Sequence, residues 1–146
     1  MYVVDTNVIS ALVSTQGGPH ASVVEWLERN SRFLYLSVIT VAEIEDGIAK
    51  AERTNARHKA SRLRDWLDAL LHLYSGRVLS FDIDTARLTG RLSDLARGCG
   101  HQPGFADLAI AATALGRGYV VLTRNLRHFT PLDVSARDLF SGPPIS

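Results

Sequence analysis

The stretch YVVDTNVISALV, residues 2–13, decides the fold of this chain of 146 residues. Its first three residues, Tyr2–Val4, predict a short buried strand, and residues 8–13 form an apolar segment that suits a helix. Asp5 follows the strand directly. In open parallel α/β sheets, ligand sites form just beyond the carboxyl ends of the strands. The stretch therefore predicts the start of an α/β fold and the first residue of a site.

Strands and helices alternate along the rest of the chain, which indicates a parallel sheet with helices on both faces. Residues 15–19 break the first helix. We expect further helices over residues 21–29, from 40 to 48, over 55–74, from 82 or 84 to 97 and over 105–115, and strands over 33–37, 77–81, 119–123 and near 133–134. The predicted fold is α/β. It has one domain over residues 1–140, whose mostly parallel central sheet of four to five strands is flanked by helices in an α/β/α sandwich, and a tail over 141–146.

The composition is that of a folded protein in a reducing compartment. The hydrophobic fraction of 46% and the charged fraction of 21% lie in the ordinary globular range, which excludes a disordered or collagen-like chain. Cys99 is the only cysteine, so neither an internal disulfide nor a multi-cysteine zinc site can form. We see no basic-then-apolar leader, and no apolar run approaches the roughly 20 residues of a membrane span. We therefore expect a cytoplasmic protein with no membrane segment.

The positive charge is unevenly distributed, although the net charge is only +1. Residues 50–64 carry six lysines and arginines against one acid, Glu52. Arg53 and Arg57 in this stretch, with Arg124 and Arg127 after the fourth strand, are candidates for contacts to a nucleic-acid backbone. A solvated helix face is the alternative role for most of the charges in 50–64.

Three acids and an amide are expected at one edge of the sheet. Asp5 follows the first strand and Asn125 the fourth, whereas Glu43 and Asp107 lie near the starts of helices that would begin at that edge. Each acid also has a structural explanation. Asp5 could cap the following helix, Asp107 could interact with the helix dipole, and Glu43 could form a capping box with Thr40. The apolar neighbours of Glu43 suggest a buried carboxylate, which needs a partner or a cation.

Two other acids, Asp82 and Asp84, are assigned to capping, because nothing else in the sequence singles them out.

Carboxylates brought together in this way repel one another, so one of them takes up a proton unless a cation intervenes. Mg²⁺ and Mn²⁺ favour oxygen ligands, and Mg²⁺ keeps several waters when only one or two carboxylates hold it. A water of this kind can become a nucleophile, and phosphodiester hydrolysis then depends on positioning and charge neutralisation. The predicted chemistry is metal-dependent hydrolysis of a phosphodiester.

Four segments in this order resemble the PIN-domain family, in particular the VapC-like and FitB-like toxins of bacterial toxin–antitoxin pairs. The segments are VDTNVIS at 4–10, SVITVAEI at 37–44 with Gly47-Ile48 following, ADLAIAATA at 106–114, and LTRN at 122–125 followed by His128-Phe129. The resemblance spans nearly the whole chain and implies a Mg²⁺-dependent endoribonuclease, with Mn²⁺ as an alternative ion, that leaves a 5′-phosphate and a 3′-hydroxyl. It also implies a cognate antitoxin as partner, RNA as substrate and a homodimer.

The resemblance assigns roles to particular residues. Asp5, Glu43 and Asp107 would be catalytic metal ligands, and Asn125 would occupy the fourth catalytic position. Three supporting residues, Thr6, Asn7 and Thr123, would order the acids or a water.

The family often has aspartate where Asn125 stands, which leaves open a PIN-like binding module with weak catalysis that acts through antitoxin or RNA binding. Glu45 and Asp46 also add negative charge beside Glu43.

A phosphoacceptor receiver domain is excluded by its charge requirement. Such a domain needs a lysine near a late strand, and the only lysines are Lys50 and Lys59 in the central region. A P-loop nucleotide binder fails for the same reason. The helix ending at Tyr74 offers more apolar positions than a small sheet can cover, which suggests a dimer interface, with a fully internal core as the alternative.

Overall fold

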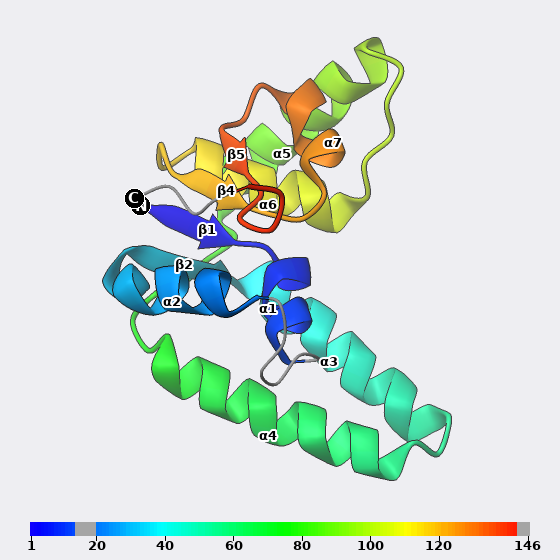
Figure 1. Cartoon of the computed structure of the whole chain (residues 1–146). Coiled ribbons are helices and arrows are strands. Elements are labelled where there is room, and N and C mark those ends of the chain that lie inside the picture. The colour runs from blue at the N-terminus through cyan, green and yellow to red at the C-terminus, as the bar shows by residue number, and fades with distance from the viewer. Residues whose placement is uncertain (14–19, 143–146) are drawn as a thin grey trace.

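The computed structural model describes residues 1–13 and 20–142 and confirms the α/β sandwich (Figure 1). The predicted break at 15–19 and most of the predicted tail lie outside the described residues. The strands are β1 (Tyr2–Val4), β2 (Leu34–Ser37), β3 (Val78–Leu79), β4 (Val120–Leu122) and β5 (Ala136–Arg137). The helices are α1 (Thr6–Val13), α2 (Ala21–Arg29), α3 (Val38–Arg53), α4 (Arg57–Leu73), α5 (Ile83–Gly98), α6 (Phe105–Leu115) and α7 (Leu126–Phe129), with short 3-10 turns at Ser31–Phe33 and Thr130–Leu132.

The five strands form one parallel sheet in the order β3-β2-β1-β4-β5. The chain proceeds outward from β1 to β2 and β3 on one side, and then returns to place β4 on the other side of β1. The order therefore reverses between β1 and β4. In open α/β sheets this is the point at which a crevice forms beyond the carboxyl ends of the strands. Asp5 lies at the carboxyl end of β1, at this crevice.

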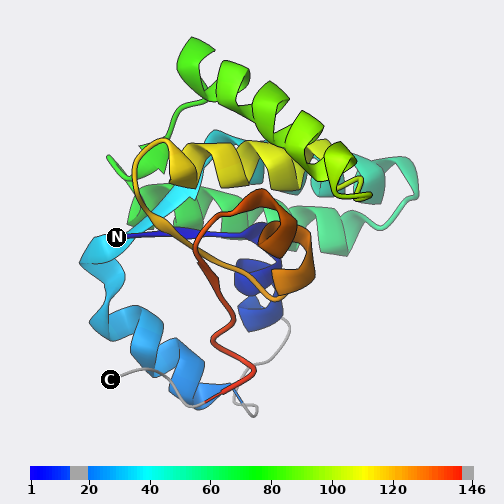
Figure 2. The ribbon, with the colours of Figure 1, turned by 90° about the horizontal axis from the view of Figure 1, so that it is seen from above.

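Neighbouring residues of the central strands face two separate cores, as the two-residue period of a strand requires. Val4 belongs to the core covered by α1 to α4, and Val3 belongs to the core covered by α5, α6 and α7. Leu122 and Val121 divide in the same way on β4. Helices thus cover both faces of the sheet (Figure 2). A site can therefore form only at the ends of the strands.

Helices α3 and α4 form a hairpin that extends away from the sheet (Figure 1). Asn55, in the turn between them, has a φ of 61°, a left-handed conformation that asparagine tolerates better than most residues. Leu67, Leu70 and Tyr74 are buried, and the other apolar positions that suggested a dimer along this helix are partly buried against the same core. Leu73 remains 64% exposed. No helix in the described part of the chain has the length and apolar character to cross a membrane.

Several predicted details differ from the structure. Helix α3 begins at Val38, directly after β2, and its N-cap is Ser37, whose Oγ accepts a hydrogen bond from the backbone N of Ile39. Thr40 lies inside the helix, so the predicted capping box with Glu43 is wrong. The fifth strand begins at Ala136, after the predicted 133–134. Asp82 is confirmed as the N-cap of α5, since its carboxylate accepts from the backbone N of Thr85.

Candidate active site

Asp5 lies at the carboxyl ends of the strands, where the predicted acids gather; we call this end of the sheet the carboxylate edge. Asp5 is buried there, with only 3% of its surface exposed. Its Oδ2 accepts a hydrogen bond of 2.8 Å from the Thr123 hydroxyl at the end of the neighbouring strand β4. The pKa of this carboxyl is raised to about 6, mainly by burial and also by the charges of Asp107 and Glu43, which together outweigh the lowering effect of the Thr123 hydrogen bond. In the described part of the chain Asp5 has no ion-pair partner. A carboxylate in this setting favours either a proton or a cation.

Glu43 reaches the same edge from α3, and a hydroxyl of α1 holds it. Thr6 Oγ1 donates to Glu43 Oε1 at 2.7 Å, and the hydroxyl of the buried Thr40 lies 3.2 Å from the same Thr6 oxygen. Glu43 itself is exposed, so the prediction of a buried carboxylate is wrong. Its apolar neighbours Val41 and Ile44 turn away from it around the helix. Glu43 therefore lies open to a ligand while a side-chain hydrogen bond orients it.

Asp107 lies in the first turn of α6 and contacts His128 of α7. The distance from Asp107 Oδ2 to His128 Nδ1 is 2.7 Å, with the two side chains 22% and 35% exposed respectively. His128 belongs to one of the four segments that resemble the family, but no sequence pattern pairs it with Asp107, which is 21 residues away. A histidine that holds one carboxylate oxygen leaves the other free and orients the group, as partners of metal ligands commonly do.

Thr123 connects Asp5, Asn7 and the loop that follows β4 into one network, whereas Thr6 contacts Glu43 and Thr40. The fully buried Thr123 hydroxyl donates to Asp5 and accepts from the Asn7 side chain at 3.3 Å and from the backbone N of Asn125 at 3.0 Å. Asn7 in turn accepts from the backbone N of Arg124 at 3.0 Å. Asn125 thus enters the network through its backbone, and the network fixes the loop that follows β4 against β1.

The four predicted arginines fall into two groups. Arg124 and Arg127 are exposed on the loop and helix that follow β4, beside the carboxylates. Arg53 and Arg57 lie at the far tip of the α3–α4 hairpin (Figure 1). Ten residues of helix separate Arg53 from Glu43, which corresponds to about 15 Å along the axis. Only the first group lies near the candidate site.

The donor set fits a hard divalent cation. The nearby ligands are carboxylate oxygens with hydroxyls and amides behind them, and such oxygen donors suit Mg²⁺ and Mn²⁺. Among the residues that the structure describes, no three histidine, cysteine or acidic side chains are arranged to hold one ion together. Mg²⁺ is commonly held by one or two carboxylates and keeps its remaining waters, so the arrangement suits that ion better than a closed protein cage.

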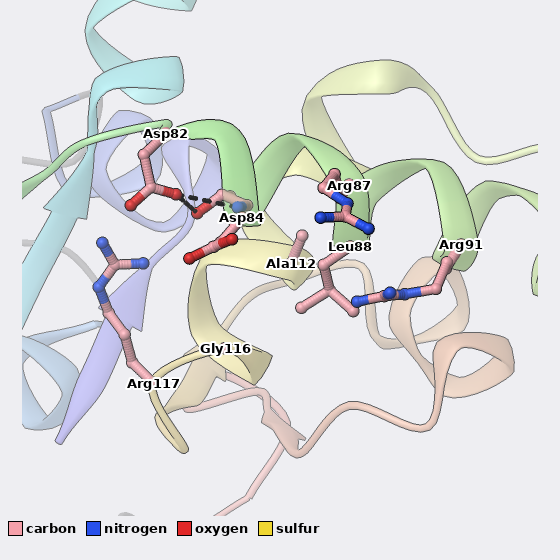
Figure 3. A pocket seen from close by; sticks show the side chains of 9 residues that line it. Asp82, Asp84, Arg87, Leu88, Arg91, Ala112, Gly116 and Arg117 are labelled. Carbon is pink, nitrogen blue, oxygen red and sulfur yellow. Dashed lines mark hydrogen bonds between the residues drawn. The ribbon is translucent and has the colours of Figure 1, made fainter.

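A cavity of about 570 Å³ lies elsewhere, between α5 and the end of α6, and none of the predicted site residues lines it (Figure 3). Three arginines, Arg87, Arg91 and Arg117, surround it together with Asp82 and Asp84. Hydrogen bonds from Thr85 lower the pKa of Asp82, with a smaller contribution from Arg117. Asp82 therefore has a structural role as the cap of α5, in agreement with the capping prediction, whereas Asp84 lies in the first turn of that helix and is not its cap.

Comparison with known proteins places this geometry in a family. The model of the PIN domain matches residues 2–132. The VapC ribonuclease Y4jK of Sinorhizobium fredii is 36% identical over 143 residues, which are 97% of this chain and 96% of the relative. The toxin FitB of Neisseria gonorrhoeae is 36% identical over 139 residues, which are 92% of this chain and 95% of the relative.

Solved structures show the same similarity. The crystal structure of FitAcB from Neisseria gonorrhoeae has a TM-score of 0.77 and 34% identity, over 97% of this chain and 100% of that one. DNA-bound VapBC from Salmonella typhimurium has a TM-score of 0.77 and 27% identity, over 94% and 96% of the two chains. The match to the family model covers most of the chain and includes Asp5, Glu43 and Asp107. This chain belongs to the PIN domain family.

Proposed function

We propose that this chain is a metal-dependent endoribonuclease and the toxin of a toxin–antitoxin pair. The observation that carries the proposal is the convergence of acids at the crevice between β1 and β4, where Thr123 holds the buried Asp5 and the adjacent Thr6 holds Glu43. The charges of Glu43 and Asp107 also raise the pKa of Asp5. The relatives named as a VapC ribonuclease and as the toxin FitB support both parts of it.

The proposed metal ligands are drawn from Asp5, Glu43 and Asp107, of which one or two would hold Mg²⁺ or Mn²⁺ together with its waters. Bound there, the ion would supply the positive charge that brings an RNA phosphodiester against three acids and lowers the pKa of an attacking water. Each acid has its own orienting partner, because Thr123 holds Asp5, Thr6 holds Glu43 and His128 holds Asp107. These hydrogen bonds place the carboxylate oxygens before the substrate arrives, which reduces the reorganisation that the reaction requires.

An RNA cleavage assay tests the enzyme proposal. We expect the purified chain to cleave single-stranded RNA in Mg²⁺ or Mn²⁺ and to lose this activity in chelator or after Asp107→Asn. Asp84→Asn is the matched control, because Asp84 is an exposed acid in the first turn of another helix, away from the edge. Equal activity in the wild-type and Asp107→Asn chains would overturn the assignment.

The same assay separates the enzyme from a PIN-like module with weak catalysis. Asn125 is the feature that favours the second candidate, since it contributes no negative charge where the family often has aspartate. A binding module would retain RNA in a mobility-shift experiment but would release no product in either metal.

We propose that the antitoxin binds the apolar groove of about 580 Å³ between α1, α2 and α4. Apolar residues make up most of its lining, among them Leu12, Val24, Leu27, Trp66 and Leu73. Several structural neighbours are complexes, including one described as a toxin-antitoxin complex from Klebsiella pneumoniae. Leu73→Asp should weaken co-purification with the cognate antitoxin while RNA cleavage persists. Unchanged affinity for the antitoxin would place its interface elsewhere.

We also propose a homodimer. Its interface would lie around α5 and α6, and not along α4, the helix whose apolar pattern suggested a dimer. Ile83 and Phe105 are 78% and 62% exposed, and the Phe105 ring contacts that of Phe81 at a centroid distance of 6.0 Å. Exposed apolar side chains of this size mark interaction surfaces when they adjoin. Light scattering at working concentration should give the mass of two chains, and the mass of one chain would contradict the proposal.

A further inference from the structure

A cation and two aromatic rings form a stack beside the carboxylate edge. The guanidinium carbon of Arg124 lies 4.6 Å from the centroid of the Phe140 ring, and the His20 ring meets the same ring edge-on at 4.7 Å. We call Arg124, Phe140 and His20 the aromatic stack. Figure 2 shows the segment after β5 passing beside the start of α2, which brings Phe140 to His20. The stack thus joins three segments that are distant in the sequence.

The backbone around Phe140 is fixed. Its N–H donates to Asp138 Oδ1 at 2.8 Å, and the preceding Leu139 is buried in the core beneath α1 to α4. At the end of β5, the carbonyl of Arg137 accepts from the backbone N of Thr123 at 2.9 Å. The ring is therefore held on the same framework as the hydroxyl that contacts Asp5.

Arg124 itself is positioned by its backbone, and its guanidinium has no polar partner within the described part of the chain. The backbone N–H of Arg124 donates to the Asn7 side chain, and the Asn7 amide donates to Thr123. Two hydrogen bonds thus connect Arg124 to Thr123, the residue that holds Asp5. Among the described residues, its guanidinium has no carboxylate within ion-pair distance and no hydrogen-bond acceptor. A guanidinium lying on a ring offers its edge N–H groups, which match phosphate oxygens in pairs.

Among the described residues, two other arginines lie over aromatic rings; Arg77 differs from Arg124 in its hydrogen bonds and Arg32 in its position. The Arg77 guanidinium, 4.8 Å from the Tyr74 ring, donates to the backbone carbonyls of Leu34 and Leu73. Arg32 lies 5.6 Å from the Phe33 ring, at the amino end of β2 and so at the opposite edge of the sheet from Asp5. Of the three pairs, only that of Arg124 combines free donors with a position at the carboxylate edge.

We infer that Arg124 binds a backbone phosphate of the RNA strand next to the scissile one, and that Phe140 is the positioning residue that holds its guanidinium ready. The inference rests on the proposed ribonuclease function and specifies how the site holds its substrate. A guanidinium already restricted by a ring loses less freedom when it binds, so the ring contributes to affinity without touching RNA. The edge-on contact of His20 with the Phe140 ring limits the movement of that ring.

Steady-state cleavage of a single-stranded RNA oligonucleotide in Mg²⁺ tests the inference. Arg124→Ala should raise KM about tenfold, the effect of losing a charged hydrogen bond, with kcat little changed. Phe140→Leu should raise KM about two- to fivefold. Phe140→Tyr, which keeps the ring, should retain the wild-type KM. Phe33→Leu is the matched control, because it removes the ring beneath Arg32 at the opposite edge.

Two further measurements separate a positioning role from a structural one. The double variant Arg124→Ala with Phe140→Leu should have the KM of Arg124→Ala alone, because Phe140 acts through Arg124. The slope of log KM against log salt should fall by about 0.7 in Arg124→Ala, which loses one phosphate contact, and should stay unchanged in Phe140→Leu.

The outcomes are distinct. If the wild-type chain cleaves RNA but Arg124→Ala keeps its KM, the inference fails and the proposed function stands. Effects of Phe140→Leu that add to those of Arg124→Ala would overturn the positioning role. Weaker binding of the antitoxin by Arg124→Ala, with unchanged RNA kinetics, would assign the stack to the partner protein and overturn the inference. A wild-type chain that cleaves no RNA would instead refute the proposed function.

Discussion

Asp5 shows how one buried carboxyl links stability to function. In the folded chain its pKa is about 6 against an ordinary value of 3.8, mainly because it is buried. The folded state therefore holds this proton more tightly than the unfolded state does. The resulting stabilisation is complete below about pH 4 and is lost as the pH rises through 6, at a cost of up to about 3 kcal/mol without metal.

Replacement of Asp5 should therefore stabilise the metal-free chain at neutral pH. We expect Asp5→Asn in chelator to have a higher free energy of unfolding than the wild type at pH 7 and to lose most of that advantage at pH 4, where the native carboxyl is protonated. Urea denaturation at the two pH values measures the difference. The same advantage at both would show that Asp5 is not held at a raised pKa.

His128 should act on catalysis through Asp107. Because its ring orients one carboxylate oxygen at 2.7 Å, His128→Ala should lower kcat/KM about 10- to 100-fold, as loss of a partner of a metal ligand commonly does. His128→Asn can place an amide N–H near the position of Nδ1 and should recover part of the activity. Full activity in His128→Ala would show that Asp107 needs no orienting partner.

At the scale of elements, the cap of α5 distinguishes two neighbouring acids. Asp82 accepts from the backbone N of Thr85 at 2.9 Å, whereas Asp84 lies in the first turn with no such bond. Asp82→Ala should lower the melting temperature by a few degrees, and Asp84→Ala by clearly less, since only the former leaves helix N–H groups without an acceptor. Thermal unfolding followed by circular dichroism compares them. Equal losses would assign the stabilisation to the helix dipole.

The sequence predicted long elements better than short ones. Bounds of α2 and α6 agree with the structure because a turn-forming residue or a change in apolar pattern marks each end. Helix α7 has four residues and β5 has two, too few to show a period. The start of α3 was missed because β2 runs into it with no loop, so Ser37 serves both as strand end and as cap.

The sequence could place only those residues of the candidate site that adjoin the end or the start of an element. Asp5 and Asp107 directly follow or begin elements, so the topology alone brings them to one edge. The exposure of Glu43 and its contact with Thr6 depend on the rotation of α3, which the apolar pattern did not reveal. The pairing of His128 with Asp107 and the contact of Phe140 with Arg124 join distant segments, and no local pattern encodes them.

At the scale of the whole molecule, the reversal of strand order between β1 and β4 creates the crevice of the proposed site. It leaves Asp5 at the crevice, lets α3 and α6 bring Glu43 and Asp107 to it, and places Arg124 beside it. The α3–α4 hairpin extends away from this centre, so its arginines at the tip can serve only an RNA long enough to reach them. The central claim is that the acids at this crevice bind a divalent metal ion.

Thermal unfolding with and without Mg²⁺ at pH 7 tests that claim most directly. An ion that binds only the folded chain stabilises it, and at about 100 times its Kd the melting temperature should rise by roughly 5 to 10 °C. We predict this rise in the wild type and in Asp84→Asn, with little or none in Asp5→Asn and Asp107→Asn. A wild-type chain that Mg²⁺ does not stabilise, or an equal rise in all four chains, would contradict the account.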